Sequence, residues 1–316
     1  MERAITRPRH NDSVVVVTSV VPVIINAGAG NPHVAERVDT LTALFLAGGL
    51  RVDVRLAASG ADLGALMNAA AAEHPRLLIA AGGDGTISTA AAAIAGSETV
   101  LGVLPFGTLN HFAKDLRIPL ELEEAVGNIL DGNSIAVDVG EVNGHLFINN
   151  SSLGLYPDIV RDRERQQARL GRGKLRSLVW ASLAAFRRFP FLTVRIEVEG
   201  TARSFVTPLV FVGNNEYVME GFNIGVRERI NGGKLSIYVV KKQGRAALVR
   251  LSLAALIGRL KQARDFVALT ATEFVIETRH ANILVATDGE VERMQSPLHY
   301  RLRPDSLRVI VPRAES

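Results

Sequence analysis

Three glycines, one carboxylate and one hydroxyl stand together in the segment Gly82-Gly-Asp-Gly-Thr86. Glycine lets a backbone approach a ligand closely, and consecutive backbone amides can face phosphate oxygens. A bare carboxylate among those amides would repel phosphate, so Asp84 is better suited to holding Mg²⁺ or a sugar hydroxyl. An ordinary strand-to-helix turn rich in small residues is the alternative, and the glycines alone do not decide between the two.

Two further segments carry groups that can do chemistry. In Pro105-Phe-Gly-Thr-Leu-Asn110, Gly107 gives the chain freedom, and Thr108 or Asn110 can cap the helix that follows. Far downstream, Thr287-Asp-Gly-Glu290 places two carboxylates on either side of a glycine. A carboxylate can accept the proton of a hydroxyl that attacks another group. A plain hairpin turn is the other interpretation of Asp288 and Gly289.

The first two segments follow strands. Residues 77–81 are a continuous apolar run of strand length, and a helix is expected from Thr86, as its N-cap, to residue 94. Residues 99–104 are a second apolar run, which ends at the Pro105 segment. Loops at the carboxyl ends of neighbouring parallel strands form the crevice in which open α/β sheets bind ligands.

The surrounding sequence alternates in the manner of a parallel α/β domain. Strands are expected at residues 20–25 and 51–56, and helices at 32–47 and 61–73. From about residue 137 the sequence pattern changes to strand-like segments separated by turns, which predicts an antiparallel sandwich or barrel. These segments are 135–139, 146–150, 192–198, 208–212, 234–240, 273–277 and 283–286.

Two helices are expected to interrupt the antiparallel part, at residues 161–189 and 246–266. The first carries seven basic residues ahead of an apolar stripe, and such a helix can lie on anionic lipid. A solvated basic face with the apolar stripe in the core is the alternative.

Composition limits the class of protein. With 316 residues, 47% of them hydrophobic and 22% charged, the chain is expected to form two globular domains. A net charge of +4 permits phosphate-bearing partners or anionic membranes without requiring nucleic acid. The absence of cysteine excludes disulfides and thiolate metal sites and suits the cytoplasm. No apolar run is long and uninterrupted enough for a membrane span, so we expect a protein that is soluble or lies on a membrane surface.

Taken in order, the three segments resemble the diacylglycerol kinase catalytic superfamily, which includes bacterial soluble lipid kinases, sphingosine kinases and ceramide kinases. The resemblance runs from about residue 20 to residue 312. It implies a Rossmann-like α/β nucleotide-binding domain over residues 1–137, to which residues 303–316 return. It also implies an antiparallel β-sandwich domain with inserted helices over residues 138–302, which binds the lipid substrate and faces the first domain across a cleft.

The resemblance further implies an ATP-dependent lipid kinase that uses Mg²⁺ and acts on a hydroxyl of diacylglycerol or a related lipid. Asp288 matches the proposed general base and acts with Glu290 and Asp84, and the last two are the expected metal ligands. Lys114 and Asp138 match a supporting polar network. The positions that match nucleotide-binding residues are Asn26, Gly82, Gly83, Asp84, Gly85, Thr86, Gly107, Thr108 and Asn110.

Several positions depart from the family pattern. His111 stands where many members have aspartate, and Ala27 and Ala29 replace the usual proline and serine of the first loop. Gly232 occupies a position where some bacterial members place an aspartate that holds a structural metal. We therefore do not expect that structural metal site here.

Two alternatives remain open. An NAD kinase shares the glycine and aspartate loop, although the segment from Gly107 to Ala113 argues against it. A non-catalytic nucleotide-binding or lipid-binding relative is the other, favoured by His111 and the altered first loop. Under the leading interpretation the partners are ATP and a lipid at a membrane surface, with no nucleic acid. The exposed edges of a sandwich allow a homodimer, and the expected location is the cytoplasm, including the inner face of the membrane.

Overall fold

The computed structural model describes residues 20–27, 34–154, 191–217, 227, 229–240 and 266–313 of the chain. The helix predicted at residues 161–189, with the basic face considered for lipid contact, lies outside these residues, and so does Ala29. The helix predicted at residues 246–266 also lies outside them except for Phe266, which begins a strand instead. Within the described ranges, no helix has both the length and the apolar character needed to cross a bilayer.

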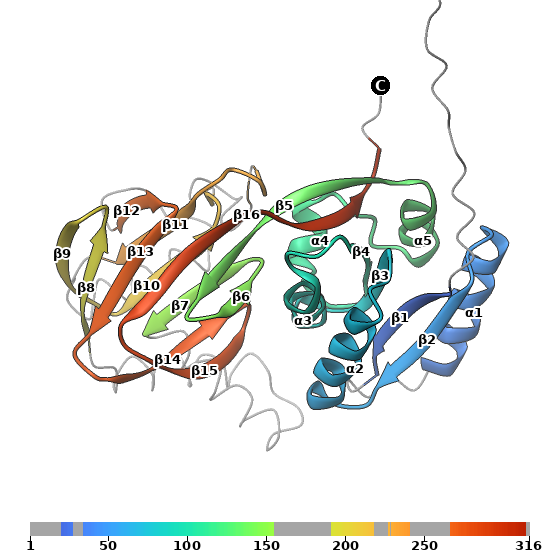
Figure 1. Cartoon of the computed structure of the whole chain (residues 1–316), viewed down its shortest axis with the longest axis horizontal. Coiled ribbons are helices and arrows are strands. Elements are labelled where there is room, and N and C mark those ends of the chain that lie inside the picture. Colours follow the sequence, from blue (N-terminus) through green and yellow to red (C-terminus); the bar gives the residue numbers. More distant parts are fainter. Residues whose placement is uncertain are drawn as a thin grey trace, which may run out of the picture.

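The first half alternates strands and helices, as predicted (Figure 1). Its strands pair in parallel in the order β2-β1-β3-β4. The elements are β1 (Val21–Asn26), α1 (Val34–Ala47), β2 (Val52–Ala57), α2 (Gly60–Ala72), β3 (Leu77–Gly82), α3 (Asp84–Ile94), β4 (Val100–Pro105), α4 (His111–Asp115) and α5 (Leu122–Asp131).

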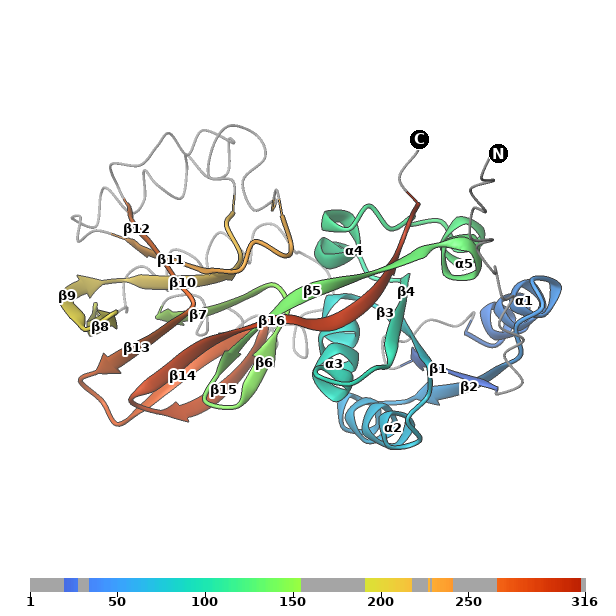
Figure 2. The ribbon, with the colours of Figure 1, turned by 45° about the horizontal axis from the view of Figure 1, so that its top comes forward.

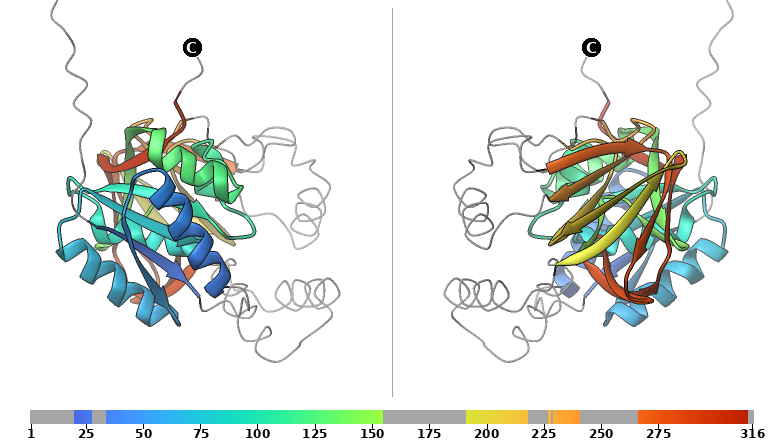
Figure 3. Two further views of the ribbon diagram at one scale, coloured as in Figure 1. Left: turned by 90° about the vertical axis from the view of Figure 1, so that its right-hand side faces the viewer. Right: turned by 90° about the vertical axis from the view of Figure 1, so that its left-hand side faces the viewer.

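Helices cover both faces of this sheet because its strands are apolar on both faces. Val23 and Ile25 pack with α1 and α5, whereas Ile24 between them packs with α2 and α3. Figure 3 shows this half end-on, with α1 and α5 on one side of the sheet and α2 on the other. Helix α5 is absent from the sequence-based prediction, although Glu123 and Glu124 in its first turn are typical of a helix start.

The described part of the second half consists mainly of strands, six of which form an antiparallel sheet in the order β12-β11-β10-β7-β14-β15. The segment predicted as one strand at residues 146–150 is divided between two strands. The strands are β5 (Asn133–Val142), β6 (His145–Phe147), β7 (Asn150–Gly154), β8 (Leu192–Val198), β9 (Thr201–Thr207), β10 (Leu209–Asn214), β11 (Leu235–Val240), β12 (Phe266–Ala271), β13 (Glu273–Thr278), β14 (Asn282–Thr287), β15 (Glu290–Gln295) and β16 (Leu298–Val311).

Aromatic side chains lie in the core between the two sheets of this half. The rings of Phe274 and Tyr300 stack with centroids 4.8 Å apart, and Phe147 meets Tyr300 edge-on at 6.4 Å. Tyr300 is fully buried, and its hydroxyl shares a hydrogen bond of 3.0 Å with Ser151 Oγ. This bond satisfies a polar group that burial would otherwise leave unpaired.

Strand β16 connects the two halves into one sheet of order β2-β1-β3-β4-β16-β13-β8-β9. It pairs in parallel with β4 through Arg308 and Val309, and antiparallel with β13 and with most of β5. Figure 2 shows β5 and β16 running together from one half to the other. The domain boundaries predicted at residues 137 and 303 fall within these strands, and they stay a prediction.

The predicted fold class is confirmed for the described residues. A parallel α/β part precedes an antiparallel sandwich, and solved structures share this arrangement, as reported below. The sharing of one sheet by the two halves was not predicted. Because β16 and β5 are continuous, they hold α3 close to β6 and thereby bring the predicted site segments toward each other (Figure 1).

Candidate active site

Two glycine-containing loops meet at the carboxyl ends of β3 and β4. Gly82 ends β3 and lies opposite Pro105, which ends β4. Beyond them, Gly83 and Gly107 lie backbone against backbone, since a methyl group added to Gly107 would come within 2.5 Å of the Gly83 Cα atom. The two predicted loops therefore form one surface, and only glycine fits at Gly107 without displacing the other loop.

Thr86 has a different role from the one predicted. Its assignment as the N-cap is wrong, because α3 begins at Asp84 and Gly83 is the N-cap residue. Thr86 lies in the first turn with 2% exposure, and its Oγ1 accepts a hydrogen bond of 3.1 Å from Asn26 Nδ2. The structure thus brings Asn26 and Thr86 together and ties the end of β1 to the glycine loop.

Asn110 shapes the second loop. It occupies the N-cap position of α4 with a left-handed φ of 50°, but its side chain makes no cap hydrogen bond. Its Oδ1 instead accepts from Gly107 N at 3.0 Å, and its Nδ2 donates to Gly107 O at 2.9 Å. The side chain closes the loop on itself, whereas Thr108 beside it is exposed.

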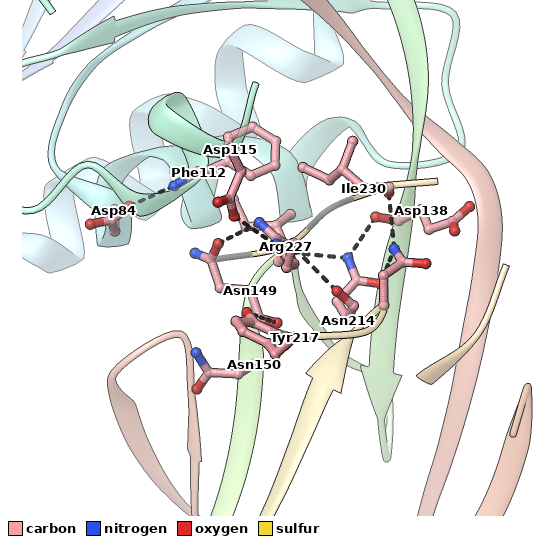
Figure 4. Close-up of polar contacts among 12 residues, drawn as sticks. Asp84, Phe112, Asp115, Asp138, Asn149, Asn150, Asn214, Tyr217, Arg227 and Ile230 are labelled. Atoms are coloured by element: carbon pink, nitrogen blue, oxygen red, sulfur yellow. Dashed lines mark hydrogen bonds and ion pairs between the residues drawn. The ribbon is translucent and has the colours of Figure 1, made fainter. Parts of the chain in front are cut away.

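Asp84 links the glycine loop to α4. Its Oδ1 accepts a hydrogen bond of 3.2 Å from the backbone amide of Phe112, in the first turn of α4 (Figure 4). Such first-turn amides have no partner within their own helix. One oxygen of Asp84 thereby fixes α4 against the loop.

Glu290 brings a second carboxylate to the loop from the other half of the molecule. It begins β15, and its Oε1 atom would lie 4.0 Å from a methyl group placed on Gly85. Asp84 and Gly85 form the first turn of α3, where the helix dipole favours negative charge. The structure therefore gathers two of the three predicted acidic residues around the start of α3.

Asp288 is held by four hydrogen-bond donors. Its Oδ2 accepts from Ile148 N at 2.8 Å and from Ser88 Oγ at 2.5 Å. Its Oδ1 accepts from Asn149 N at 2.8 Å and from Asn150 N at 3.0 Å. A carboxylate offers about four lone-pair positions, so this set occupies them all.

The contact between Asp288 and Ser88 crosses from the sandwich to the α/β half. Ser88 belongs to α3, the helix that follows the glycine loop. Burial raises the pKa of the Asp288 carboxyl, while the hydrogen bonds from Ser88 and from the amides of residues 148–150 lower that pKa. The base predicted from the sequence is therefore placed beside the predicted nucleotide loop.

The two residues predicted to support the site lie in different surroundings. Asp138 is 2% exposed, and it accepts hydrogen bonds from Gly233 N at 2.8 Å and from Asp305 N at 3.1 Å. Lys114 is exposed on α4, as is His111. The neighbouring Asp115, which was not predicted, is the α4 residue whose side chain joins the polar network drawn in Figure 4.

The position of Gly232 faces the amide of Asn215. A methyl group on Gly232 would come within 2.8 Å of Asn215 Oδ1, and that oxygen is buried without a hydrogen-bond partner among the described residues. The pair offers no carboxylate for a cation.

Asp84 and Glu290 are the predicted Mg²⁺ ligands. Across the described part of the chain, no group of three or more histidine, aspartate or glutamate side chains is placed to hold a metal. Mg²⁺ in phosphoryl-transfer sites is commonly held by one or two carboxylates together with substrate phosphates and waters. Asp84 and Glu290, on the two sides of Gly85, fit that requirement once a nucleotide supplies the remaining oxygens.

Sequence reasoning missed the residues that hold Asp288. Ser88, Asn149 and Asn150 were not singled out, and neither was Arg227, which contacts the same segment. A signal was present, because residues 149–152 are four consecutive polar residues within an otherwise strand-like stretch. Polar residues in buried strands require partners, but the sequence does not say which partners.

Comparison with known proteins identifies the class of protein. Residues 20–142 match the diacylglycerol kinase catalytic domain. Residues 157–311 match the YegS C-terminal NAD kinase beta sandwich-like domain. The two matches together span most of the chain and confirm the resemblance to the diacylglycerol kinase catalytic superfamily that the sequence motifs predicted.

The chain is similar to proteins named "Probable lipid kinase YegS-like" from Yersinia pestis (strain Pestoides F) and from Yersinia pseudotuberculosis serotype O:1b (strain IP 31758). Each is 36% identical over 149 residues, which is 45% of this chain and 49% of the relative. The chain thus spans about half the length of the curated relatives it matches.

Solved structures resemble the whole described chain. A putative diacylglycerol kinase from Bacillus anthracis str. Sterne is 25% identical with a TM-score of 0.72, over 93% of this chain and 98% of that one. A second such structure from the same strain is 26% identical with a TM-score of 0.69 over the same shares of both chains. Both the relatives and these structures are named as kinases.

Proposed function

We propose that this protein is an ATP-dependent kinase that transfers the γ-phosphoryl group to the hydroxyl of a lipid, diacylglycerol or a related one. The observation that carries the proposal is the position of Asp288. Its carboxylate comes from the sandwich half, yet it accepts a hydrogen bond from Ser88 on the helix that follows the glycine loop. A proton acceptor therefore stands next to the surface suited to phosphates.

The reaction follows from this placement. The lipid hydroxyl oxygen attacks the γ-phosphorus, and its proton passes to the Asp288 carboxylate. The bond from that phosphorus to the bridging oxygen breaks, and ADP leaves with the electron pair. Backbone amides at the start of α3 and around Gly107 face the phosphates in this scheme and stabilise their charge.

The Ser88 hydroxyl must leave Asp288 Oδ2 before this carboxylate can accept a proton from the lipid. The other three donors to Asp288 are backbone amides, which are fixed by β7 and its neighbours. The hydroxyl of Ser88 can turn away by rotation about its Cα–Cβ bond. We propose that the lipid hydroxyl takes over the position of the Ser88 hydroxyl at Asp288 Oδ2.

Asp84 and Glu290 would hold Mg²⁺ together with the nucleotide. When bound, Mg²⁺ would neutralise part of the negative charge of the phosphates. The chain itself positions the two carboxylates from different halves, one at the start of α3 and one at the start of β15. The metal site would therefore combine one carboxylate from each half of the molecule.

Replacing Glu290 with glutamine is expected to raise the Mg²⁺ concentration for half-maximal activity by about tenfold or more, because one of two charged ligands is lost. The measurement is a Mg²⁺ titration of phosphate transfer at saturating ATP. Glu292→Gln is the matched control, since Glu292 lies on the same strand and contacts His145 Nδ1 at 2.8 Å instead. Equal Mg²⁺ dependence in both variants would contradict the role of Glu290.

The direct test is phosphate transfer from labelled ATP with Mg²⁺ to diacylglycerol, sphingosine, ceramide and phosphatidylglycerol in mixed micelles, with NAD assayed in parallel. Labelling of one lipid supports the proposal and names the acceptor. Labelling of NAD instead would favour the NAD kinase alternative. Binding of ATP without transfer to any acceptor would favour a non-catalytic relative and contradict the proposal for this panel.

A further inference from the structure

Arg227 is buried where the two halves of the molecule meet. Its side chain has 0% exposure, and each of its three nitrogen atoms donates a hydrogen bond. Nε binds Asp115 Oδ2 at 2.7 Å, and Nη2 binds Asn149 Oδ1 at 2.9 Å. Nη1 binds Ile148 O at 2.6 Å and Asn214 O at 3.3 Å.

Arg227 binds residues 148–149, the segment whose backbone amides also bind Asp288. Arg227 binds Ile148 through its carbonyl and Asn149 through its side chain, while the amides of the same two residues donate to Asp288. Tyr217 adds a hydrogen bond of 2.9 Å from its hydroxyl to Asn149 O. Burial raises the pKa of Tyr217 to about 12, so this hydroxyl remains a donor at neutral pH.

The other partner of Arg227 belongs to the nucleotide side. Asp115 ends α4, and its side chain is only 8% exposed. The start of the same five-residue helix is bound to Asp84 through the amide of Phe112. A continuous set of contacts therefore runs from Asp84 through α4 and Arg227 to the segment beneath Asp288 (Figure 4).

We infer that Arg227 is a positioning residue that aligns the Asp288 carboxylate with the nucleotide loop, by clamping residues 148–149 to Asp115 of α4. The inference rests on the proposed function, because it assigns Asp288 the role of base. Arg227 does not touch the reacting atoms in this account. It acts through the amides that hold Asp288.

Arginine is suited to this position in a way that lysine is not. The guanidinium is planar and presents donors in a fixed fork, and here the fork reaches a carboxylate, two carbonyls and an amide oxygen. A lysine ammonium keeps the positive charge beside Asp115 but is a single point on a flexible stem. Arg227→Lys therefore preserves the charge and removes the alignment.

The test compares Arg227→Lys with wild type in phosphate transfer to the accepted lipid. We expect kcat to fall by about 10- to 100-fold, because a catalytic group that is displaced from its productive position costs about this much in rate. We expect little change in KM for ATP. Arg55→Lys is the control, since Arg55 on β2 forms hydrogen bonds to the carboxylates of Asp53 and Glu73, away from the site. A kcat for Arg227→Lys equal to that of the control would overturn the inference.

A double-mutant cycle separates positioning from general structural support. If Arg227 acts through Asp288, Arg227→Lys should lower kcat strongly in the wild-type background and by less than about threefold in the Asp288→Asn background. Equal losses in both backgrounds would show that Arg227 supports the fold without acting through Asp288. Asp115→Asn provides a second way to release the clamp should Arg227→Lys fail to fold, with the same expectation.

A measurement that needs no turnover keeps the inference distinct from the proposed function. Backbone amide NMR signals of Ile148, Asn149 and Asn150 report their hydrogen bonds to Asp288. We expect these three signals to shift and their hydrogen exchange to speed up in Arg227→Lys and in Asp115→Asn, while amides of β3 are unchanged. If wild type phosphorylates no acceptor, the proposed function fails, and this experiment still decides whether the clamp exists. Unchanged amides in both variants would overturn the clamp.

Discussion

Asp288→Asn is expected to reduce kcat for lipid phosphorylation by about 10²- to 10⁴-fold, the contribution that a positioned general base usually makes. Asparagine has nearly the same shape but cannot take up the proton of the lipid hydroxyl. It also replaces one carboxylate oxygen, which accepts hydrogen bonds, with an amide nitrogen that only donates and would face the donors that now bind Asp288. The measurement is phosphate transfer from labelled ATP, with nucleotide binding followed by calorimetry.

Nucleotide affinity should survive this change, because Asp288 belongs to the sandwich half and the glycine loops do not depend on it. Asp305→Asn is a matched control. Asp305 has a left-handed φ of 49°, against 48° for Asp288, and it is an exposed residue of β16. The same substitution on the same backbone conformation should leave turnover unchanged there. Wild-type turnover in Asp288→Asn would remove this residue from the mechanism.

Gly107→Ala is expected to destabilise the fold by about 1–3 kcal/mol, the usual cost of forcing extra atoms into a packed site. The added methyl group would lie 2.5 Å from Gly83 Cα and 2.6 Å from Asn110 Oδ1. Because the first contact is to backbone, the two loops must separate. Nucleotide binding should weaken for the same reason, since the phosphates are expected to rest on the surface that both loops form.

Thermal unfolding and calorimetric titration with a non-hydrolysable ATP analogue measure the two effects. Gly127→Ala is the matched control, since Gly127 lies inside α5 and a methyl group there would meet nothing within 4 Å. Replacing a glycine in a helix by alanine usually stabilises by about 0.5–1 kcal/mol. A Gly107→Ala protein as stable as wild type, with unchanged affinity, would show that the loops do not need their close contact.

The sequence determined much of the local organisation. Apolar runs at residues 77–81 and 99–104 predicted β3 and β4, and the glycine segments after them predicted the loops at the carboxyl ends of these strands. The order of the three motifs predicted the family, which the comparisons confirm. Such features depend on neighbours in the chain, and periodicity and turn chemistry record them directly.

Helix-capping bonds predicted from residue type are absent where the side chain binds another partner. Thr86 has the residue type of an N-cap, but its hydroxyl lies beside Asn26, 60 positions away. Asn110 also has the type of a cap, and yet its side chain closes the second loop. In both cases a tertiary or loop contact was available to the polar group, and it replaced the helix-capping bond that the sequence favours.

The tertiary structure alone decided how the site is assembled. Ser88 and Asp288 are 200 positions apart, and Arg227 and Asp115 are 112 apart, so no local pattern relates the members of either pair. The continuous course of β16 from β13 to β4 brings the two halves together. A sequence indicates which polar residues will be buried and will therefore need hydrogen-bond partners. The packing of the whole chain determines which partners they have. For this protein the sequence supplied the chemical groups, and the shared sheet placed Asp288 beside the helix that follows the glycine loop.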